Sequence, residues 1–192
     1  MDVTRREALR RLSFLVGGAI SAPVMSAVLS GCRARSDSAG WTPQALTPEQ
    51  VELVDTLVDL IIPPTDTPGA REAGVTAFID KLLHDWVVSE DRTRFLTGLA
   101  DLDDQARRAH DAAFTETPLD QQRAMLARLD QEASRARADR TDPLPFFATL
   151  KEWTLVGYYT SEAGATEELQ WLAAPGRYDA DLPLTQVGRT WA

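Results

Sequence analysis

The sequence predicts an all-α fold, with a single helical domain of about five to six helices over residues 47–192. Apolar residues recur there at steps of three and four, the spacing of one helix face. No segment alternates apolar and polar residues with the period of two that a half-buried strand shows. About 160 residues follow position 31, enough for one domain with a modest core.

The first helix is predicted over residues 47–62. Thr47 suits the N-cap, Pro48 suits the first helical position, and Gln50 completes a capping box. The apolar face then consists of Val51, Val54, Leu57, Val58, Ile61 and Ile62. Two consecutive prolines follow and end the helix, because proline lacks the backbone N–H that the helix needs.

A polar loop over residues 65–70 separates this helix from the second. Pro68 and Gly69 favour a tight turn, and the neighbouring side-chain oxygens can bond to the local backbone. The second helix is predicted over residues 74–88. Its buried stripe is expected to consist of Val75, Phe78, Ile79, Leu82, Leu83, Trp86 and Val87.

Three further helices and one short helix complete the domain. Each of the three begins where a cap residue or a proline suits the first turn. The starting points are Ser89, Thr117-Pro118 and Asp142-Pro143. The inward-facing residues are Phe95, Leu96, Leu99, Leu102, Leu119, Met125, Leu126, Leu129, Phe146, Phe147, Leu150, Trp153 and Tyr158. A short sixth helix is predicted over residues 165–172, and the tail beyond it is expected to be extended.

Residues 1–31 resemble an export signal of the twin-arginine type, which directs folded proteins across a bacterial membrane. Arg5 and Arg6 follow Thr4, and a stretch without charge then runs from Leu12 to Gly31. The alternative is an uncleaved membrane anchor, which needs about 20 strongly apolar residues. The stretch barely reaches that length and contains a proline, so the sequence favours a cleaved signal.

Cys32 is predicted to carry lipid. Leu29-Ser30-Gly31-Cys32 resembles the bacterial lipobox, in which cleavage leaves the cysteine as an acylated N-terminus. Cys32 is the only cysteine, so the alternative is an incidental free thiol without a disulfide partner. Residues 32–46 are then a short tether, and the lipid would hold the chain at a membrane on the periplasmic side. Arg33 in place of Asp is compatible with the outer membrane.

Charge and composition argue against several functional classes. Beyond residue 31 the chain has 16 basic and 27 acidic residues, a net charge of −11, whereas nucleic-acid binding needs a basic face. A single cysteine excludes covalent haem attachment, iron–sulfur spacing and a cysteine zinc cluster. The sequence also lacks the glycine pattern of a dinucleotide site and the serine elbow of a hydrolase. We therefore expect no cofactor in this chain.

Few side chains suggest catalysis or metal binding. Asp80 and His84 share a helix face and could bind a metal, although a surface ion pair is commoner at this spacing. The acidic residues within 101–104 lack the glycine and glutamate of a calcium loop and indicate a solvated helix face. Asp66 could act as a general base, but an aspartate that stabilises a turn is commoner.

Two segments carry a family resemblance. The first is Leu60-Ile61-Ile62-Pro63-Pro64-Thr65-Asp66-Thr67-Pro68-Gly69-Ala70, followed by Ala73-Gly74-Val75 and Phe78-Ile79-Asp80. The second comprises Phe147, Leu150-Lys151, Trp153-Thr154 and Gly157-Tyr158-Tyr159-Thr160-Ser161-Glu162. Together they resemble the gluconate 2-dehydrogenase subunit 3 family, whereas residues 90–140 carry little signature.

The resemblance implies a non-catalytic small subunit of an exported dehydrogenase that oxidises sugars, sugar acids or alcohols. In that family the large subunit holds FAD, a multihaem cytochrome c often takes the electrons, and the small subunit commonly bears the twin-arginine signal. Lipid on Cys32 would also tether the partner to a membrane. The expected partner contacts are Thr65, Asp66, Thr67, Pro68, Gly69, Tyr158, Tyr159, Ser161 and Glu162.

Two other functions stay open on the sequence. One is a stand-alone periplasmic lipoprotein, a binding module or chaperone without a dehydrogenase. The other is a small hydrolase or isomerase that uses Asp66 and His84.

Overall fold

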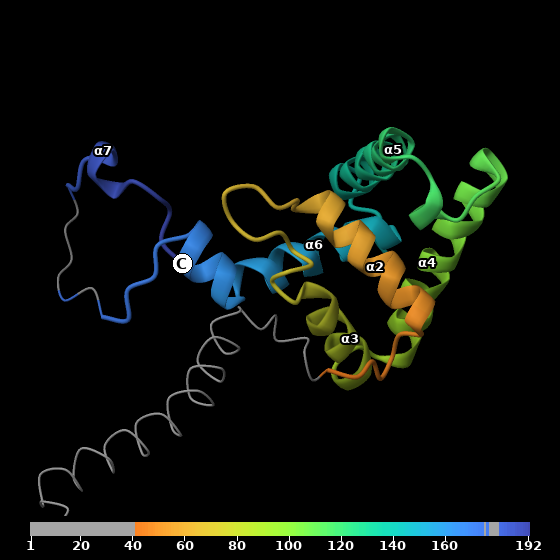
Figure 1. Ribbon diagram of the computed structural model, residues 1–192, viewed down its shortest axis with the longest axis horizontal. Helices are drawn as coiled ribbons and strands as arrows, with labels where there is room; N and C mark the ends of the chain where they lie inside the picture. Colours follow the sequence, from red (N-terminus) through yellow and green to blue (C-terminus); the bar gives the residue numbers. More distant parts are fainter. Residues whose placement is uncertain (1–40, 175, 177–180) are drawn as a thin grey trace, which may run out of the picture. The chain divides into compact units, whose positions relative to one another are not determined.

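The computed structural model describes residues 41–174, 176 and 181–192, and these form the predicted all-α domain (Figure 1). The predicted signal with Arg5 and Arg6, and the predicted lipid site at Cys32, lie outside the described residues. The described residues contain no strand beyond a single parallel bridge between Gln170 and Trp191.

The domain is built from six α-helices and two shorter helical turns within the described ranges. The α-helices are α2 (Pro48–Ile61), α3 (Val75–Asp85), α4 (Ser89–His110), α5 (Leu119–Ala138), α6 (Phe146–Tyr159) and α7 (Leu184–Val187). A 3-10 turn, η2 (Phe114–Glu116), precedes α5, and a π-helical turn, η3 (Gly164–Glu168), follows α6. Of the helices described, none combines the length and the apolar character needed to cross a bilayer.

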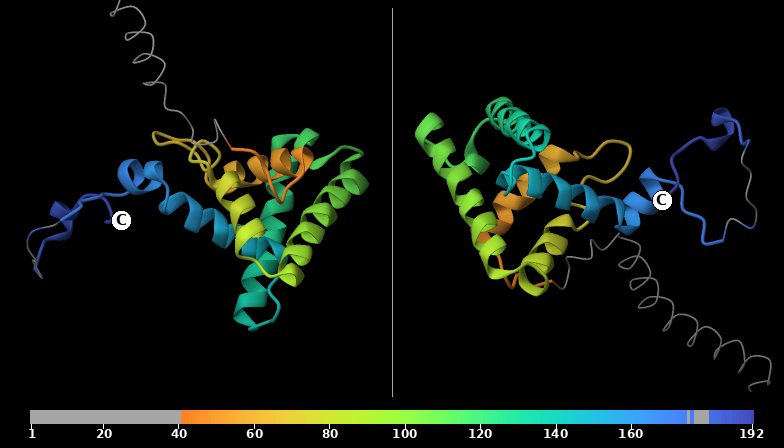
Figure 2. Two further views of the ribbon diagram at one scale, coloured as in Figure 1. Left: turned by 90° about the horizontal axis from the view of Figure 1, so that it is seen from below. Right: turned by 180° about the vertical axis from the view of Figure 1, so that it is seen from behind.

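Helix α6 lies at the centre of the packing. It contacts α2, α3, α4 and α5, which surround it in the views of Figure 2. Its residues Leu150 and Tyr158 are among the largest fully buried side chains, so α6 joins the others into one core. At Gly157 a Cβ atom would lie 2.7 Å from the ring of Phe78, so only glycine allows α3 to pack this closely.

The predicted start of the first helix is confirmed in detail. The Thr47 hydroxyl accepts a hydrogen bond from the backbone N–H of Gln50 at 3.3 Å, and the Gln50 side chain accepts one from the Thr47 N–H at 2.9 Å. This reciprocal capping box satisfies two N–H groups that have no partner inside the helix.

The second, fifth and sixth helices and the tail differ from the prediction. The fifth helix begins at Phe146 and not at Asp142-Pro143, and the tail, predicted to be extended, contains α7. Helix α3 ends at Asp85, because the N–H groups of Trp86 and Val87 both bond to the Leu82 carbonyl and the chain then turns towards α4. The prediction that Trp86 belongs to the buried stripe is therefore wrong, since its side chain is 78% exposed. In place of a sixth α-helix over 165–172, the chain forms the π-helical turn η3.

Residues 41–46, here called the N-terminal strap, are bound to the domain through Asp80. The Asp80 carboxylate is buried in α3, and its Oδ1 accepts the N–H groups of Ala45 and Leu46, each at 2.9 Å. Its Oδ2 accepts the N–H of Gln44 at 3.0 Å and the indole N–H of Trp41 at 3.2 Å. The end of the predicted tether is thus part of the packed domain.

Candidate partner-binding surface

The loop over residues 65–70 is fixed to the end of α6 by a buried tyrosine. The Tyr158 hydroxyl donates a hydrogen bond to the Pro68 carbonyl oxygen at 2.9 Å, and its side chain is only 2% exposed. Phenolic hydroxyls that are buried usually find such a partner, because leaving them unpaired is costly. The two segments that carry the family resemblance are therefore in direct contact, although about 90 residues separate them.

A second contact joins the loop to η3. The Thr67 hydroxyl donates to Glu168 Oε2 at 3.0 Å. Within the loop, the Thr65 hydroxyl donates to the Asp66 carboxylate at 3.1 Å and accepts the N–H of Thr67 at 3.4 Å. These short-range bonds are those expected of a turn and leave the Asp66 side chain exposed to solvent.

Acidic side chains on α2 hold the other end of the loop. Asp59 accepts the backbone N–H of Arg71 at 3.1 Å, and Asp55 lies 3.4 Å from the Arg71 guanidinium. Burial raises the pKa of the Asp59 carboxyl, and the nearby carboxylates of Asp55 and Glu72 add to the rise, while Arg71 opposes it. At Gly69 a Cβ atom would lie 2.7 Å from the Pro64 nitrogen, so the return of the chain requires glycine.

An apolar strip lies on the outer face of α6, next to the fixed loop. We define the strip as Leu155, Val156 and Tyr159, whose side chains are 38%, 47% and 41% exposed. They occupy the side of the helix opposite the buried residues Leu150 and Thr154. The Tyr159 ring packs edge-on against the ring of Tyr158, with centroids 5.3 Å apart, so a buried side chain supports the strip.

A groove of about 440 Å³ between α5 and α6 extends the strip. Leu155 and Val156 line it together with residues from both helices. Two ion pairs border it, Lys151 with Asp130 at 2.6 Å and Arg137 with Glu152 at 3.0 Å. An apolar centre with a polar border is the usual anatomy of a protein interface.

The nine predicted partner contacts divide into two groups. Thr65, Asp66, Tyr159 and Glu162 are exposed and accessible to another protein. The others are half-buried or buried: Thr67, Pro68, Gly69, Tyr158 and Ser161. These five hold the surface in place; the Ser161 hydroxyl, for example, donates to the Tyr158 carbonyl at 2.6 Å and accepts the Gly164 N–H at 3.1 Å.

Sequence reasoning missed Leu155 and Val156. Both fall on the polar side of a helix whose buried side was correctly predicted. Two adjacent apolar residues there are the signal that could have revealed the strip.

Asp80 and His84, the pair proposed for metal binding, each have another partner. Asp80 bonds to the strap, and the nitrogen Nδ1 of His84 lies 2.7 Å from the carboxylate of Asp85. The surface ion pair predicted between Asp80 and His84 is therefore wrong, because Asp80 is buried. Asp103 accepts the N–H of Phe114 at 2.8 Å, a structural role. In the described part of the chain, no three acidic, histidine or cysteine side chains form a group that could hold a metal ion.

Fold and surface together define the class, a small helical domain with a rigid, partly apolar face suited to binding another protein. The family model described as Gluconate 2-dehydrogenase subunit 3 matches residues 48–176, and the chain belongs to this family. The match includes the loop, α6 and η3. No curated protein sequence and no solved structure matches the chain. The family description denotes a subunit of a dehydrogenase, in keeping with an accessory protein that works in a complex.

Proposed function

We propose that this chain is a non-catalytic small subunit of an exported FAD-dependent dehydrogenase and binds the flavin subunit through the apolar strip. The observation that carries the proposal is the exposed strip on α6, which adjoins the loop that Tyr158 fixes. Both features lie within the residues that the family model matches. The substrate of the whole complex would be a sugar, a sugar acid or a related alcohol.

The strip has the properties that an interface needs. Each of its side chains still exposes about two-fifths to one-half of its surface. Covering that remainder contributes about 1 kcal/mol for each side chain, since full burial contributes about 1.5–3 kcal/mol. The hydrogen bonds at Tyr158 and Thr67 hold the neighbouring loop in place, so little conformational entropy is lost on binding.

The partner would hold FAD, which supplies the oxidation, and a multihaem cytochrome c would take the electrons in complexes that contain one. This chain would contribute the export of the flavin subunit, its stabilisation and its attachment to a membrane. Arg5 and Arg6 would direct the folded pair across the membrane. Acyl chains on Cys32 would then keep the pair on the periplasmic side of a membrane.

Purification of the complex from native membranes tests this function. We expect Val156→Asp to reduce the amount of flavin subunit that co-purifies at least tenfold, because an unpaired charge would be buried at the interface. Leu119→Asp is the matched control. Leu119 was predicted to face inward but is 50% exposed, so this variant also places Asp at an exposed apolar position. It is the first residue of α5, where a negative charge suits the helix dipole.

Circular dichroism should show equal helix content for both variants. Equal recovery of the flavin subunit with Val156→Asp and with the wild-type chain would refute the assignment of the strip. A wild-type chain that is isolated from membranes as a lone monomer would refute the proposed function and favour a stand-alone lipoprotein.

A further inference from the structure

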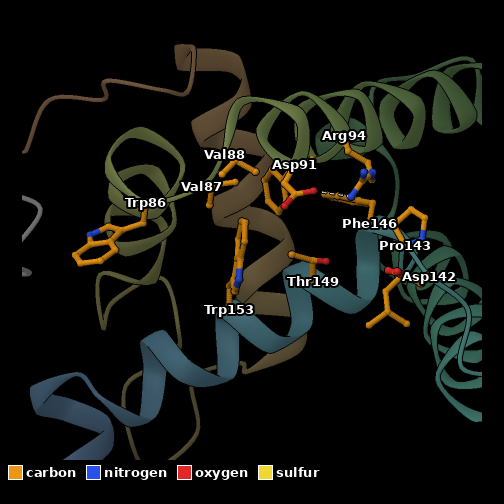
Figure 3. A pocket seen from close by; sticks show the side chains of 12 residues that line it. Trp86, Val87, Val88, Asp91, Arg94, Asp142, Pro143, Phe146, Thr149 and Trp153 are labelled. Carbon is orange, nitrogen blue, oxygen red and sulfur yellow. Dashed lines mark hydrogen bonds and ion pairs between the residues drawn. The ribbon is translucent and has the colours of Figure 1, made fainter.

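A second apolar surface lies where α3 turns into α4. We call it the Trp86 groove. It has a volume of about 430 Å³, and its walls come from the α3–α4 turn, the first turns of α4, and the first half of α6 with the loop before it (Figure 3). Trp86 and Val88 are 78% and 64% exposed, more than any other large apolar side chain in the described part of the chain. An exposed tryptophan beside a valine is unusual unless a partner covers it.

The floor of the groove is rigid and aromatic. The Phe95 ring stacks on the Trp153 indole with centroids 4.9 Å apart and meets the Phe146 ring edge-on at 5.1 Å. Phe95 is buried, while Trp153 and Phe146 are only partly covered and face the groove. Aromatic rings held in this way offer a fixed surface that an apolar or cationic side chain can contact without reorganisation.

The border of the groove carries excess negative charge. Arg94 lies 2.7 Å from Asp91, the pair joined by a dashed line in Figure 3, and 3.8 Å from Glu90. Asp142 lies on the α6 side and makes no hydrogen bond or ion pair with any residue that the structure describes. Two carboxylates, those of Glu90 and Asp91, therefore share the Arg94 guanidinium, and the carboxylate of Asp142 is left for a positive partner.

We infer that the Trp86 groove binds a segment of the partner flavin subunit that offers an arginine or lysine beside an apolar side chain. The cation would pair with Asp142 at one end of the groove, whereas Trp86 lies at the other end, beyond Trp153 (Figure 3). The apolar side chain would cover Trp153 and Phe146. The inference rests on the proposed function, since the flavin subunit is the occupant, and it adds a second contact to that of the strip.

The open shape of the groove favours a polypeptide over a small ligand. Small-molecule sites enclose most of the ligand surface, whereas the high exposure of Trp86 leaves one wall open to solvent. The negative border also disfavours an anionic membrane surface. Tryptophan is enriched among the residues that contribute most to protein–protein binding.

Photo-crosslinking in the full complex tests the inference. A benzophenone amino acid replaces Trp86 in the full chain, and the cross-linked peptide is identified by mass spectrometry after purification from native membranes. The matched control is the same replacement at Trp171, which is 62% exposed and does not line the groove. We expect position 86 to cross-link a flavin-subunit segment that has an arginine or lysine within about four residues, roughly one helical turn.

Charge reversal supplies the second readout. We expect Asp142→Lys to reduce the cross-link at position 86 at least tenfold, while Asp104→Lys, which reverses an exposed charge on α4 outside the groove, leaves it unchanged. Cross-linking to a second copy, to lipid or to a segment without a cation would overturn the inference, as would equal effects of the two lysine variants. A complex that retains the flavin subunit but yields no cross-link at position 86 refutes the groove alone. Loss of the flavin subunit from every preparation refutes both proposals.

Discussion

Replacing Asp80 by asparagine is expected to lower the free energy of unfolding by about 3 kcal/mol. The amide oxygen can still accept the N–H groups of Ala45 and Leu46, but the amide nitrogen then faces the N–H groups of Gln44 and Trp41. Two hydrogen bonds to a charged acceptor are lost, and each contributes roughly 1.5–3 kcal/mol. Water recovers part of this loss, because Gln44 is exposed and Trp41 is half-buried.

The assay is urea unfolding combined with amide hydrogen exchange. For a domain of this size about 3 kcal/mol corresponds to a decrease in Tm of roughly 6–12 °C. Exchange at residues 44–46 should rise most, because the strap detaches before the core opens. Asp101→Asn on the exposed face of α4 is the control and should change stability by less than about 0.5 kcal/mol. If Asp80→Asn behaves like this control in both measurements, the Asp80 carboxylate does not hold the strap.

Two further outcomes are expected. Tyr158→Phe removes the bond to Pro68 without changing the packed ring, so stability should fall by about 1–2 kcal/mol and amide exchange should increase in the loop; unchanged exchange would contradict the role given to Tyr158. The raised pKa of Asp59 means that the folded state binds its proton at a higher pH than the unfolded chain does. The wild-type protein should therefore gain stability relative to Asp59→Asn as the pH falls from neutral through that pKa, and parallel stability curves would exclude this linkage. The asparagine oxygen can still accept the Arg71 N–H. The difference in stability between the two proteins therefore reports the charge of Asp59 alone.

The parts of the fold that local chemistry determines could be predicted from the sequence. The capping box at Thr47 and Gln50 and the periodic apolar faces of α2, α4 and α6 depend on residues close in the chain. The end of α3 could not be located, because Trp86 fits the helical stripe by its spacing. Trp86 is exposed because the chain turns into α4 at this point, and the spacing of apolar residues does not reveal that turn.

Much of the candidate surface depends on contacts between distant residues. The family resemblance identified both the loop and the end of α6, but not that Tyr158 bonds to Pro68. Five of the nine suggested contacts therefore hold the surface rather than form its accessible part. The bonds from the strap to Asp80 likewise join residues that are 34 to 39 positions apart in the chain. Spacing along the helix could not reveal them, and it suggested His84 as the partner of Asp80.

The strap also determines how mechanical load enters the domain. A pull applied ahead of Trp41 would reach the middle of α3 through the Asp80 carboxylate before it reached the capping box of α2. Ala45 and Leu46 share one oxygen of that carboxylate and Gln44 and Trp41 the other, so neighbouring bonds divide the force. A tethered form of the protein would thus bear tension first on α3, the helix that packs against α6.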